Sequence, residues 1–426
     1  MKIKNIHIFG GGTVSHVANH FAVCAPAYGS TAKQLQHIMQ CDARFDNFNI
    51  HLELTKMAGG NLETNEDVAN RIEQLKADSR TKIIFFNCAL VDYMPYSVIG
   101  YHLDETKRNL VLNPDKYGHR LNTSDIPSVN VSLYAAVKII PSIRNGRKDI
   151  FLVGFKTTCG ATRQEMYEKG LHLCKSGSVN LVLVNDTKTH VNFIVTPEEA
   201  TYGDFDNRHD TLVELIDIAW HRSHLTFTQS TVVDGKSVDW NSELVPHSLR
   251  TIVNYCIGKG AYKPIPEKKW TAGHFAHKLS DTEFLSSIRK SNLNELNKIG
   301  LVYVKTDGPD TVVAYGAKPS VGGQSQRIVF NDHVGYDCIV HFHSELKKNH
   351  SDNIPVVSQR EVECGSHQCG KNTSNGLKEF YGGIKAVMLN NHGPNIVFNK
   401  NIDPQLVIDF IERNWDLNTK TGGYQV

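Results

Sequence analysis

The chain has 426 residues, and its 46 lysines and arginines nearly balance 44 aspartates and glutamates, which leaves a formal net charge of +2. At roughly 150 residues per domain, this length predicts two or three domains with cores of their own. The near-zero net charge argues against a nucleic-acid binder, and no apolar run approaches the roughly 20 residues that cross a bilayer. We therefore expect a globular protein without nucleic-acid or membrane partners.

The first residues and the cysteines favour a cytoplasmic location. Residues 1–12 predict a short strand that ends in glycines, which differs from the basic and long apolar stretches of a signal peptide. The 9 cysteines are spread along the chain without the spacing of a disulfide framework. We expect them to be reduced thiols of a cytoplasmic protein.

The first half of the chain alternates between apolar strands and helices. The pattern predicts a tight glycine loop at residues 10–13, strands at 5–9, 82–86, 150–153 and 181–184, and helices at 32–39, 65–76 and 162–174. Apolar, β-branched strands that alternate with helices indicate a parallel sheet covered on both faces. Ligands of such sheets bind beyond the carboxyl ends of the strands, where these glycines and several polar residues lie.

The pattern changes after Trp220, and we expect a domain boundary near residues 235–245. Residues 223–269 lack a strong period and contain three prolines. The chain beyond them predicts a second α/β unit, with strands at 300–305, 311–315, 338–341 and 386–389 and helices at 281–288 and 404–414. The expected domains are therefore residues 1–235 and 245–426.

Three histidines in the second half predict a metal site. His341 and His343 stand two residues apart at the end of a predicted strand, so both point to the same face. His392 directly follows the next apolar strand, in an Asn-His-Gly context. Three imidazoles at the ends of two strands are typical of a site for Zn²⁺, or another divalent metal, that leaves positions open for substrate. Because the chain has 21 histidines, two polar residues that merely close a strand are the alternative for the His-x-His pair alone.

The same residues resemble the class II aldolase/adducin family. That family carries His-x-His and, about 50 residues later, an apolar strand followed by His-Gly, as residues 386–394 do here. The resemblance covers roughly residues 245–420 and implies a class II aldolase-like α/β domain. It implies that zinc polarises a ketose carbonyl and stabilises an enediolate during retro-aldol cleavage. Residues 273–277 and 318–323 lie where the family carries its substrate phosphate-binding loops, which assigns the substrate phosphate to Ser320, Gly322 and Gly323.

One position departs from that family. Its enzymes carry a catalytic glutamate some twenty residues before His-x-His, where this chain has Gln324 and Gln326. Glutamine cannot act as a general base, although Glu345, Glu361 or Glu363 could take the place of the family's catalytic glutamate. The candidate catalytic residues are therefore Gln324, Gln326 and Glu345, and the metal site is better supported than aldol cleavage.

Five motifs in the first half resemble the phosphopantothenoylcysteine synthetase domain of coenzyme A biosynthesis. They are residues 10–13, 87–95, 112–115, 152–156 and 184–186, in the order in which that domain carries them. The resemblance covers about residues 1–225 and implies a Rossmann-like domain that binds CTP or ATP with Mg²⁺ and activates a carboxylate. It assigns nucleotide binding to Gly10, Gly11, Gly12, Asp92, Pro114, Asp115, Lys116, Tyr117, Phe155, Lys169 and Lys175.

This half also departs from its family. Ala25 occupies the position of an asparagine associated with the acyl-nucleotide intermediate, and residues 100–105 replace a lysine-rich stretch. Each missing lysine removes a fixed positive charge that would neutralise phosphate. We therefore expect nucleotide binding to survive more readily than the ligation reaction.

Together these patterns predict a two-domain metabolic enzyme, with a synthetase-like nucleotide-binding domain and a zinc-dependent aldolase-like domain. Its partners would be a nucleotide and a phosphorylated small molecule. The alternative is a ligand-binding or sequestering protein that keeps both sites without the family reactions. By resemblance to both families, we expect a homo-oligomer.

Overall fold

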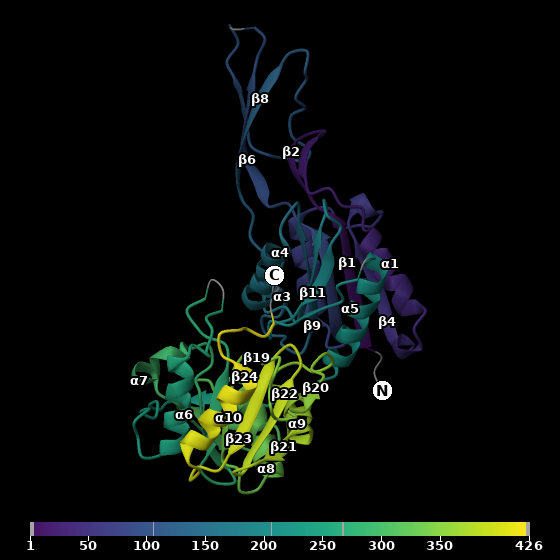
Figure 1. Ribbon diagram of the computed structural model, residues 1–426. Coiled ribbons are helices and arrows are strands. Elements are labelled where there is room, and N and C mark those ends of the chain that lie inside the picture. The colour runs from purple at the N-terminus through teal and green to yellow at the C-terminus, as the bar shows by residue number, and fades with distance from the viewer. Residues whose placement is uncertain (1–3, 105, 206, 266–267, 423–426) are drawn as a thin grey trace. The chain divides into compact units, whose positions relative to one another are not determined.

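The computed structural model describes residues 4–104, 106–205, 207–265 and 268–422, without the side chains of residues 321–324 (Figure 1). Its contacts divide the chain into two compact units. Unit 1 comprises Met1–Thr158, Leu173–Asn192 and Phe205–Ala219, and unit 2 comprises Cys159–His172, Phe193–Asp204 and Trp220–Val426. The division passes through two helices, α4 (Arg163–Gly177) and α5 (Arg208–Ser223).

Unit 1 is built on the parallel sheet that the sequence predicts. Its strands have the order β10-β9-β5-β1-β4, and each neighbouring pair is parallel. The bounds are β1 (Lys4–Gly12), β4 (Phe48–Leu54), β5 (Thr81–Ala89), β9 (Phe151–Thr158) and β10 (Leu181–Asp186). Because β4 and β5 lie on opposite sides of β1, the strand order reverses between β1 and β5. Their carboxyl ends are therefore the place where open α/β sheets bind ligands.

The helices of unit 1 largely confirm the predicted pattern. The expected helices correspond to α1 (Ser30–Gln40), α2 (Asn65–Ala77) and α4. The structure adds a short helix, α3 (Ile140–Ile143). Helix α2 begins with a capping box, in which Thr64 and Asp67 bond to each other's backbone N–H groups. The chain between these elements forms the hairpin β2 (Val14–Ala18) and β3 (Phe21–Cys24) and the 3₁₀ turns η1 (Ala43–Phe45) and η2 (Lys56–Ala58).

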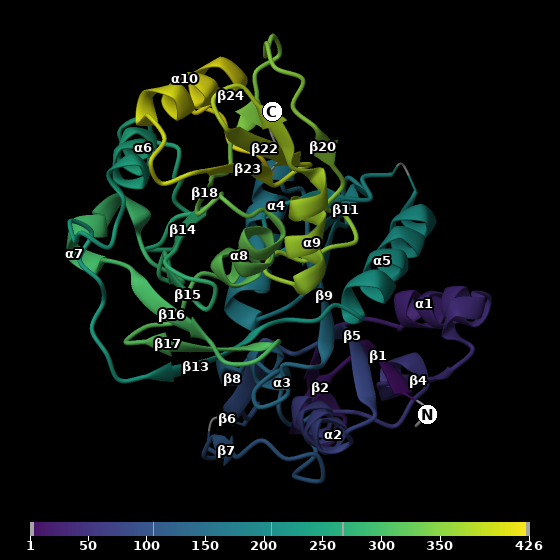
Figure 2. The same ribbon diagram turned by 90° about the horizontal axis from the view of Figure 1, so that it is seen from below.

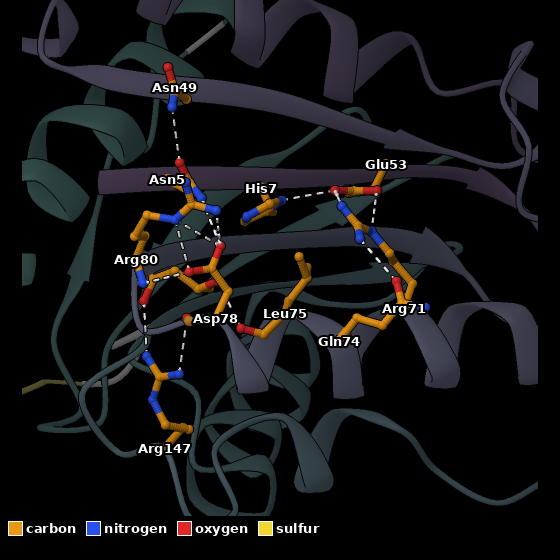
Figure 3. Close-up of polar contacts among 11 residues, drawn as sticks. Asn5, His7, Asn49, Glu53, Arg71, Gln74, Leu75, Asp78, Arg80 and Arg147 are labelled. Atoms are coloured by element: carbon orange, nitrogen blue, oxygen red, sulfur yellow. Dashed lines mark hydrogen bonds and ion pairs between the residues drawn. The ribbon is translucent and has the colours of Figure 1, made fainter. Parts of the chain in front are cut away.

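A polar cluster joins the sheet to α2 and the turn that follows it (Figure 3). The buried His7 of β1 meets the carboxylate of Glu53 on β4, with Nδ1 and Oε1 2.8 Å apart, and stacks on the ring of His51. Arg71 of α2 donates two hydrogen bonds to the same carboxylate. Charged groups this deep are retained only when they are paired, so α2 is fixed in position by these bonds.

A three-stranded antiparallel sheet of order β7-β6-β8 follows β5, and the sequence pattern did not predict it. In Figure 1 it extends away from the parallel sheet of unit 1 as a narrow arm. Large apolar side chains on it are exposed, including Tyr96 and Val111. The arm comprises β6 (Tyr93–Tyr101), β7 (Leu110–Leu112) and β8 (Ser128–Ala135).

Unit 2 contains a larger, mixed sheet. Its strands have the order β13-β17-β16-β15-β14-β18-β23-β22-β20, and β21 also pairs with β22. Their bounds are β13 (Gln229–Val233), β14 (His274–Lys278), β15 (Glu283–Ser286), β16 (Val302–Thr306), β17 (Thr311–Tyr315), β18 (Cys338–His341), β20 (Val356–Val357), β21 (Lys378–Phe380), β22 (Ile384–Leu389) and β23 (Gly393–Phe398).

Helices cover both faces of this sheet (Figure 2). On one face, α6 (His247–Gly258) and α10 (Pro404–Asn414) pack against residues that include Val340 and Phe342. On the other face, α8 (Val321–Asp332) packs against Ile339, and α9 (His367–Gly376) lies beside α8. Side chains alternate along a strand, so Ile339 and His341, on either side of Val340 in β18, point to the face that α8 covers.

The remaining elements of unit 2 are short. They are β11 (Asn192–Val195), β12 (Thr201–Tyr202), β19 (Glu345–Leu346), β24 (Trp415–Asp416), α7 (Leu296–Ile299) and η3 (Leu293–Glu295). Strands β11 and β12 form an antiparallel hairpin, and β19 pairs with β24. Throughout the part of the chain that the structure describes, no helix is both long and apolar enough to span a membrane.

Two local predictions are wrong. The expected helix at 281–288 is the strand β15, because Phe284 packs on one face of the sheet and Leu285 on the other. The expected glycine loop at residues 10–13 is largely the end of β1, which continues in register with β5 to Gly12. The other predicted strands and α10 are confirmed.

Candidate metal centre

His341 and His343 lie at the carboxyl end of β18 on the face that α8 covers. His341 pairs with His274 on β14 and with Asn395 on β23. Both side chains are buried, with relative exposures of 1% and 6%. The local sequence places them here because Val340 and Phe342 enter the core on the opposite face.

His392 reaches the same point from the turn between β22 and β23. Its N–H bonds to the carbonyl of Leu389, and Asn391 before it adopts a left-handed φ of 58°. A Cβ on Gly393 would lie 2.1 Å from the carbonyl oxygen of Phe342. Only glycine allows this close approach, which explains the Asn-His-Gly sequence at the turn.

The three histidines form a compact triangle. The ring centroids are 5.1 Å apart for His341 and His343, 4.6 Å for His341 and His392, and 4.9 Å for His343 and His392. One ring nitrogen from each lies within 4.8 Å of the other two. The structure therefore brings together all three of the residues that the sequence predicted as metal ligands.

The environment keeps His341 neutral and fixes its tautomer. Burial lowers its pKa well below the usual range, and the facing rings of His392 and His343 lower it further. Nδ1 of His341 lies 2.7 Å from the carbonyl oxygen of Pro394, which can only accept, so the proton is on Nδ1. Nε2 then carries a lone pair, and among the described residues it has no hydrogen-bond partner.

These residues fit a divalent metal. Neutral imidazoles are the form that binds metal, and a backbone acceptor on the second ring nitrogen is the usual way in which such a ligand is oriented. A buried lone pair without a partner costs free energy unless a cation or a donor meets it. His341, His343 and His392 would hold the ion, with Zn²⁺ favoured by an all-nitrogen set of three.

A fourth histidine and a glutamine border the triad. The ring of His274 stacks on His341 at 4.5 Å, and Nδ1 of His274 contacts Nε2 of Gln326. Burial lowers the pKa of His274 well below its usual range, so it also stays neutral. The sequence singled out the segment of His274 without giving this residue a role. A narrow pocket beside these rings is also lined by Thr373, His392 and Asn395.

The other predicted residues of unit 2 are placed as follows. Ser320 is the N-cap residue of α8, and the backbone of Gly322 and Gly323 belongs to the first turn of that helix. The side chain of Gln324 lies outside the described residues. Glu345 is on β19, and its N–H bonds to Thr419 rather than to a histidine.

Two charged residues at the triad were missed by the sequence interpretation. Glu199, in the loop between β11 and β12, places Oε2 3.3 Å from Nδ1 of His343. Nζ of Lys420 lies 2.7 Å from the other oxygen of the same carboxylate. All of these residues belong to unit 2. Glu199 is 144 positions before His343 in the sequence, and no local motif marks it.

The glycines predicted to bind nucleotide lie at the end of β1. A Cβ on Gly10 would lie 2.4 Å from Cβ of Ala32 in α1, and one on Gly12 would lie 1.7 Å from the carbonyl oxygen of Ala25. The N–H of Gly12 bonds to the carbonyl of Ala27. These glycines therefore allow close packing of the following chain, and the N–H of Gly12 is already used within the protein.

The other predicted nucleotide-binding residues have polar contacts of their own. Asp92 pairs with Lys138 at 2.5 Å, and Lys116 pairs with Glu63 at 2.5 Å. Asp115 accepts the N–H of Tyr117, whose ring lies under Lys116. The remaining residues are Gly11 on β1, Pro114 before Asp115, Phe155 on β9, Lys175 on the unit 1 part of α4, and Lys169 on the part of α4 that belongs to unit 2.

A buried network joins the loops that follow β1 and β5. Oγ1 of Thr13 donates to Oδ1 of Asn65 across 2.6 Å and accepts the N–H of Val91 across 2.9 Å. The side-chain amide of Asn65 donates to the carbonyl of Val91. This network holds together the two loops at the point where the strand order of the sheet reverses.

No protein-family model matches the chain, and no curated protein matches it. Solved structures match parts of it. The DNA/pantothenate metabolism flavoprotein from Streptococcus pneumoniae is 17% identical over 50% of this chain and 98% of its own, with a TM-score of 0.40. L-fuculose-1-phosphate aldolase from Thermus thermophilus is 18% identical over 39% of this chain and 88% of its own, with a TM-score of 0.28. YgbL, a putative aldolase/epimerase/decarboxylase from Escherichia coli, is 17% identical over 38% of this chain and 82% of its own, with a TM-score of 0.29. Their names belong to the two families that the sequence resembles.

Proposed function

We propose that unit 2 is a metal-dependent lyase that cleaves a carbon–carbon bond of a phosphorylated small molecule in the manner of a retro-aldol reaction. The observation that carries this proposal is the buried triad of His341, His343 and His392, with Nε2 of His341 available to a cation. A bound Zn²⁺ or other divalent ion would supply a Lewis acid at a substrate carbonyl or hydroxyl oxygen.

The residues around the triad would bind and orient the substrate. The first turn of α8, next to Ser320, would offer its backbone N–H groups and a favourable dipole to the substrate phosphate. The same helix carries Gln326, whose amide contacts His274 beside the triad. One helix would therefore hold the phosphate at its first turn and border the reacting end of the substrate one turn later.

The test is to load the purified protein with Zn²⁺ and supply a panel of ketose phosphates, with product aldehyde and triose phosphate measured by coupled assays. Cleavage that disappears in His341→Ala would support the lyase. Tight binding of the same compounds without turnover would support the alternative of a ligand-binding protein, which the glutamine at position 326 favours because it cannot act as a base. If the protein neither cleaves nor binds these compounds, both the lyase and the ligand-binding alternative are contradicted.

We further propose that unit 1 binds CTP or ATP with Mg²⁺. The support is the reversal of strand order between β1 and β5, with the Thr13, Asn65 and Val91 network at their carboxyl ends. Calorimetric titration of the full chain with each nucleotide tests this proposal directly. The division of the two functions between residues 1–235 and 245–426, and the cytoplasmic location, stay predictions.

A further inference from the structure

We propose that Glu199 is a fourth protein ligand of the metal ion that His341, His343 and His392 hold, and that Lys420 restrains it to binding through one oxygen. The inference rests on the metal site of the proposed function and adds to it a carboxylate from outside the strands that carry the histidines. Residues 193–204 and the histidines all belong to unit 2.

The distance between Glu199 and His343 fits two ligands of one ion. Oε2 of Glu199 is 3.3 Å from Nδ1 of His343, and this nitrogen makes no hydrogen bond that meets the usual geometry among the described residues. Two ligands that each lie about 2.0–2.1 Å from a tetrahedral ion are roughly 3.3–3.4 Å apart. The contact therefore has the length of an edge of a tetrahedral site.

The backbone holds Glu199 in this position. Residues 196–200 form a tight turn, in which the N–H of Glu199 bonds to the carbonyl of Thr196 and the N–H of Ala200 bonds to Oγ1 of Thr196. Glu199 has a φ of 74°, a conformation that costs free energy for a residue with a side chain. Such strain persists where the surrounding structure imposes it, and here it directs a carboxylate that is 1% exposed toward His343.

The preceding residue anchors the same turn. Glu198 forms an ion pair with Arg222, with Nη1 and Oε1 2.5 Å apart and both side chains almost fully buried. Arg222 also donates hydrogen bonds to the carbonyls of Gln359 and Arg360. Glu198 therefore pairs with Arg222, whereas the carboxylate of Glu199 lies beside His343 and Lys420.

The segment before the described C-terminal end crosses the centre and supplies Lys420. Thr421 donates through Oγ1 to the carbonyl of His392 across 2.6 Å, and through its N–H to the carbonyl of His343. A Cβ on Gly422 would lie 2.4 Å from the carbonyl oxygen of Glu199, so glycine is needed where the segment passes the turn. Nζ of Lys420 lies 2.7 Å from Oε1 of Glu199, and the other oxygen, Oε2, is the one that faces His343.

This arrangement accounts for the missing carboxylate on α8. Gln326 offers no charge near the triad, whereas Glu199 offers one negative charge to a dication. A ligand from a loop, rather than from the strands that carry the histidines, can yield its position to a substrate oxygen.

The experiment measures Zn²⁺ affinity of the full chain by competition with a chromophoric chelator, and the visible spectrum of the Co²⁺ form. Glu199→Gln should weaken Zn²⁺ binding by at least about 10-fold and change the Co²⁺ spectrum, because it replaces a charged ligand. Lys420→Met should strengthen binding several-fold, because it removes a cation beside the ion and frees the carboxylate. The matched control is Glu379→Gln, which removes an exposed carboxylate on β21 and should change neither quantity.

The outcomes separate this inference from the proposed function. If wild type binds one Zn²⁺ and His341→Ala loses it while Glu199→Gln binds as wild type does, the metal site stands and the role of Glu199 is overturned. If Glu199→Gln and Lys420→Met both weaken binding equally, the pair has a structural role and the inference is also overturned. If wild type binds no metal, both proposals fail. Should Glu199→Gln not fold, stronger binding by Lys420→Met with an altered Co²⁺ spectrum supports the inference, and unchanged binding contradicts it.

Discussion

The carbonyl oxygen of Pro394 accepts a hydrogen bond from Nδ1 of His341 across 2.7 Å, and this bond determines which ring nitrogen can bind a cation. The acceptor follows His392 by two residues, on the strand that pairs with β18. The turn that presents the third histidine therefore also orients the first. The geometry of the triad depends on the pairing of β18 with β23 as well as on the histidines themselves.

Replacing Gln326 by glutamate should make the stability of the protein depend on metal. Gln326 is 2% exposed and contacts the neutral His274, so Gln326→Glu buries a carboxylate without a cation and should cost on the order of 2–4 kcal/mol in the metal-free protein. Zn²⁺ at the neighbouring triad should restore part of this loss. Thermal melts with and without Zn²⁺ check this.

The matched control is Gln405→Glu, an exposed position in the first turn of α10. It replaces the hydrogen bond from Gln405 to Asp409 and should therefore shift the melting temperature by the same small amount with and without Zn²⁺. A metal-free Gln326→Glu protein as stable as wild type would show that this side chain does not border a closed, uncharged site.

Thr13→Val should weaken nucleotide binding by unit 1. The change removes the shorter hydrogen bond of the Val91 N–H and the donor to Asn65, and leaves only the 3.3 Å bond between Val91 N–H and Oδ1 of Asn65, at a cost of about 1–3 kcal/mol. Since the network holds the loops after β1 and β5, we expect at least a 10-fold loss of affinity for CTP or ATP. Calorimetry measures it, with the exposed Thr123→Val as control. Equal affinity in both variants would place the nucleotide elsewhere.

The cluster in Figure 3 predicts an acid-sensitive contribution to stability. Burial, the largest influence on Glu53, would raise its pKa, but hydrogen bonds from His7 and Arg71 outweigh it and lower the pKa to about 2. A carboxyl with a pKa lowered from its usual 4.5 stabilises the folded state above pH 4.5, and this stabilisation is lost as the pH falls toward 2. The contribution at pH 7 is about 3 kcal/mol.

Urea denaturation at pH 7 and pH 3.5 measures this contribution. Glu53→Gln should lose about 3 kcal/mol at pH 7 and show a smaller decrease between the two pH values than wild type does. The control Glu73→Gln removes an exposed partner of Lys76 and should change stability by no more than about 0.5 kcal/mol. A Glu53→Gln variant with the same pH dependence as wild type would contradict the assignment.

The arm of unit 1 is the expected site of self-association. Exposed aromatic and aliphatic side chains on three adjacent strands are typical of an interface, and Tyr96 is 61% exposed at its centre. Tyr96→Glu should convert the predicted homo-oligomer to smaller species in light scattering after gel filtration. Tyr381→Glu, at an exposed turn of unit 2, should leave the mass unchanged. A wild type that is monomeric at all concentrations would contradict the prediction.

The triad could be predicted from sequence because its members lie in local patterns. His341 and His343 end an apolar strand, and His392 stands in a turn whose glycine is required by the carbonyl of Phe342. Both signals reside in a few adjacent residues. The parallel sheet of unit 1 was predictable for the same reason, because its strands are nearly continuous apolar runs.

Glu199 and Lys420 could not be predicted, because their positions depend on contacts between segments far apart in the chain. The loop of Glu199 reads as an ordinary turn after Pro197, and only its backbone conformation directs the carboxylate inward. Strand β15 was assigned to a helix because its apolar residues are adjacent, and burial on both faces of a sheet removes the alternation that marks a strand. The arm was missed because neither face of it is fully buried.

The most direct test of the account is elemental analysis of the purified protein and of its His343→Ala variant, after reconstitution with Zn²⁺ and removal of loosely bound ions. We expect about one divalent ion per chain in wild type and none in His343→Ala, since three imidazoles are needed to hold the ion. Circular dichroism checks that the variant is folded. Wild-type protein without metal after reconstitution, or a folded variant that retains its full content, would contradict the central claim.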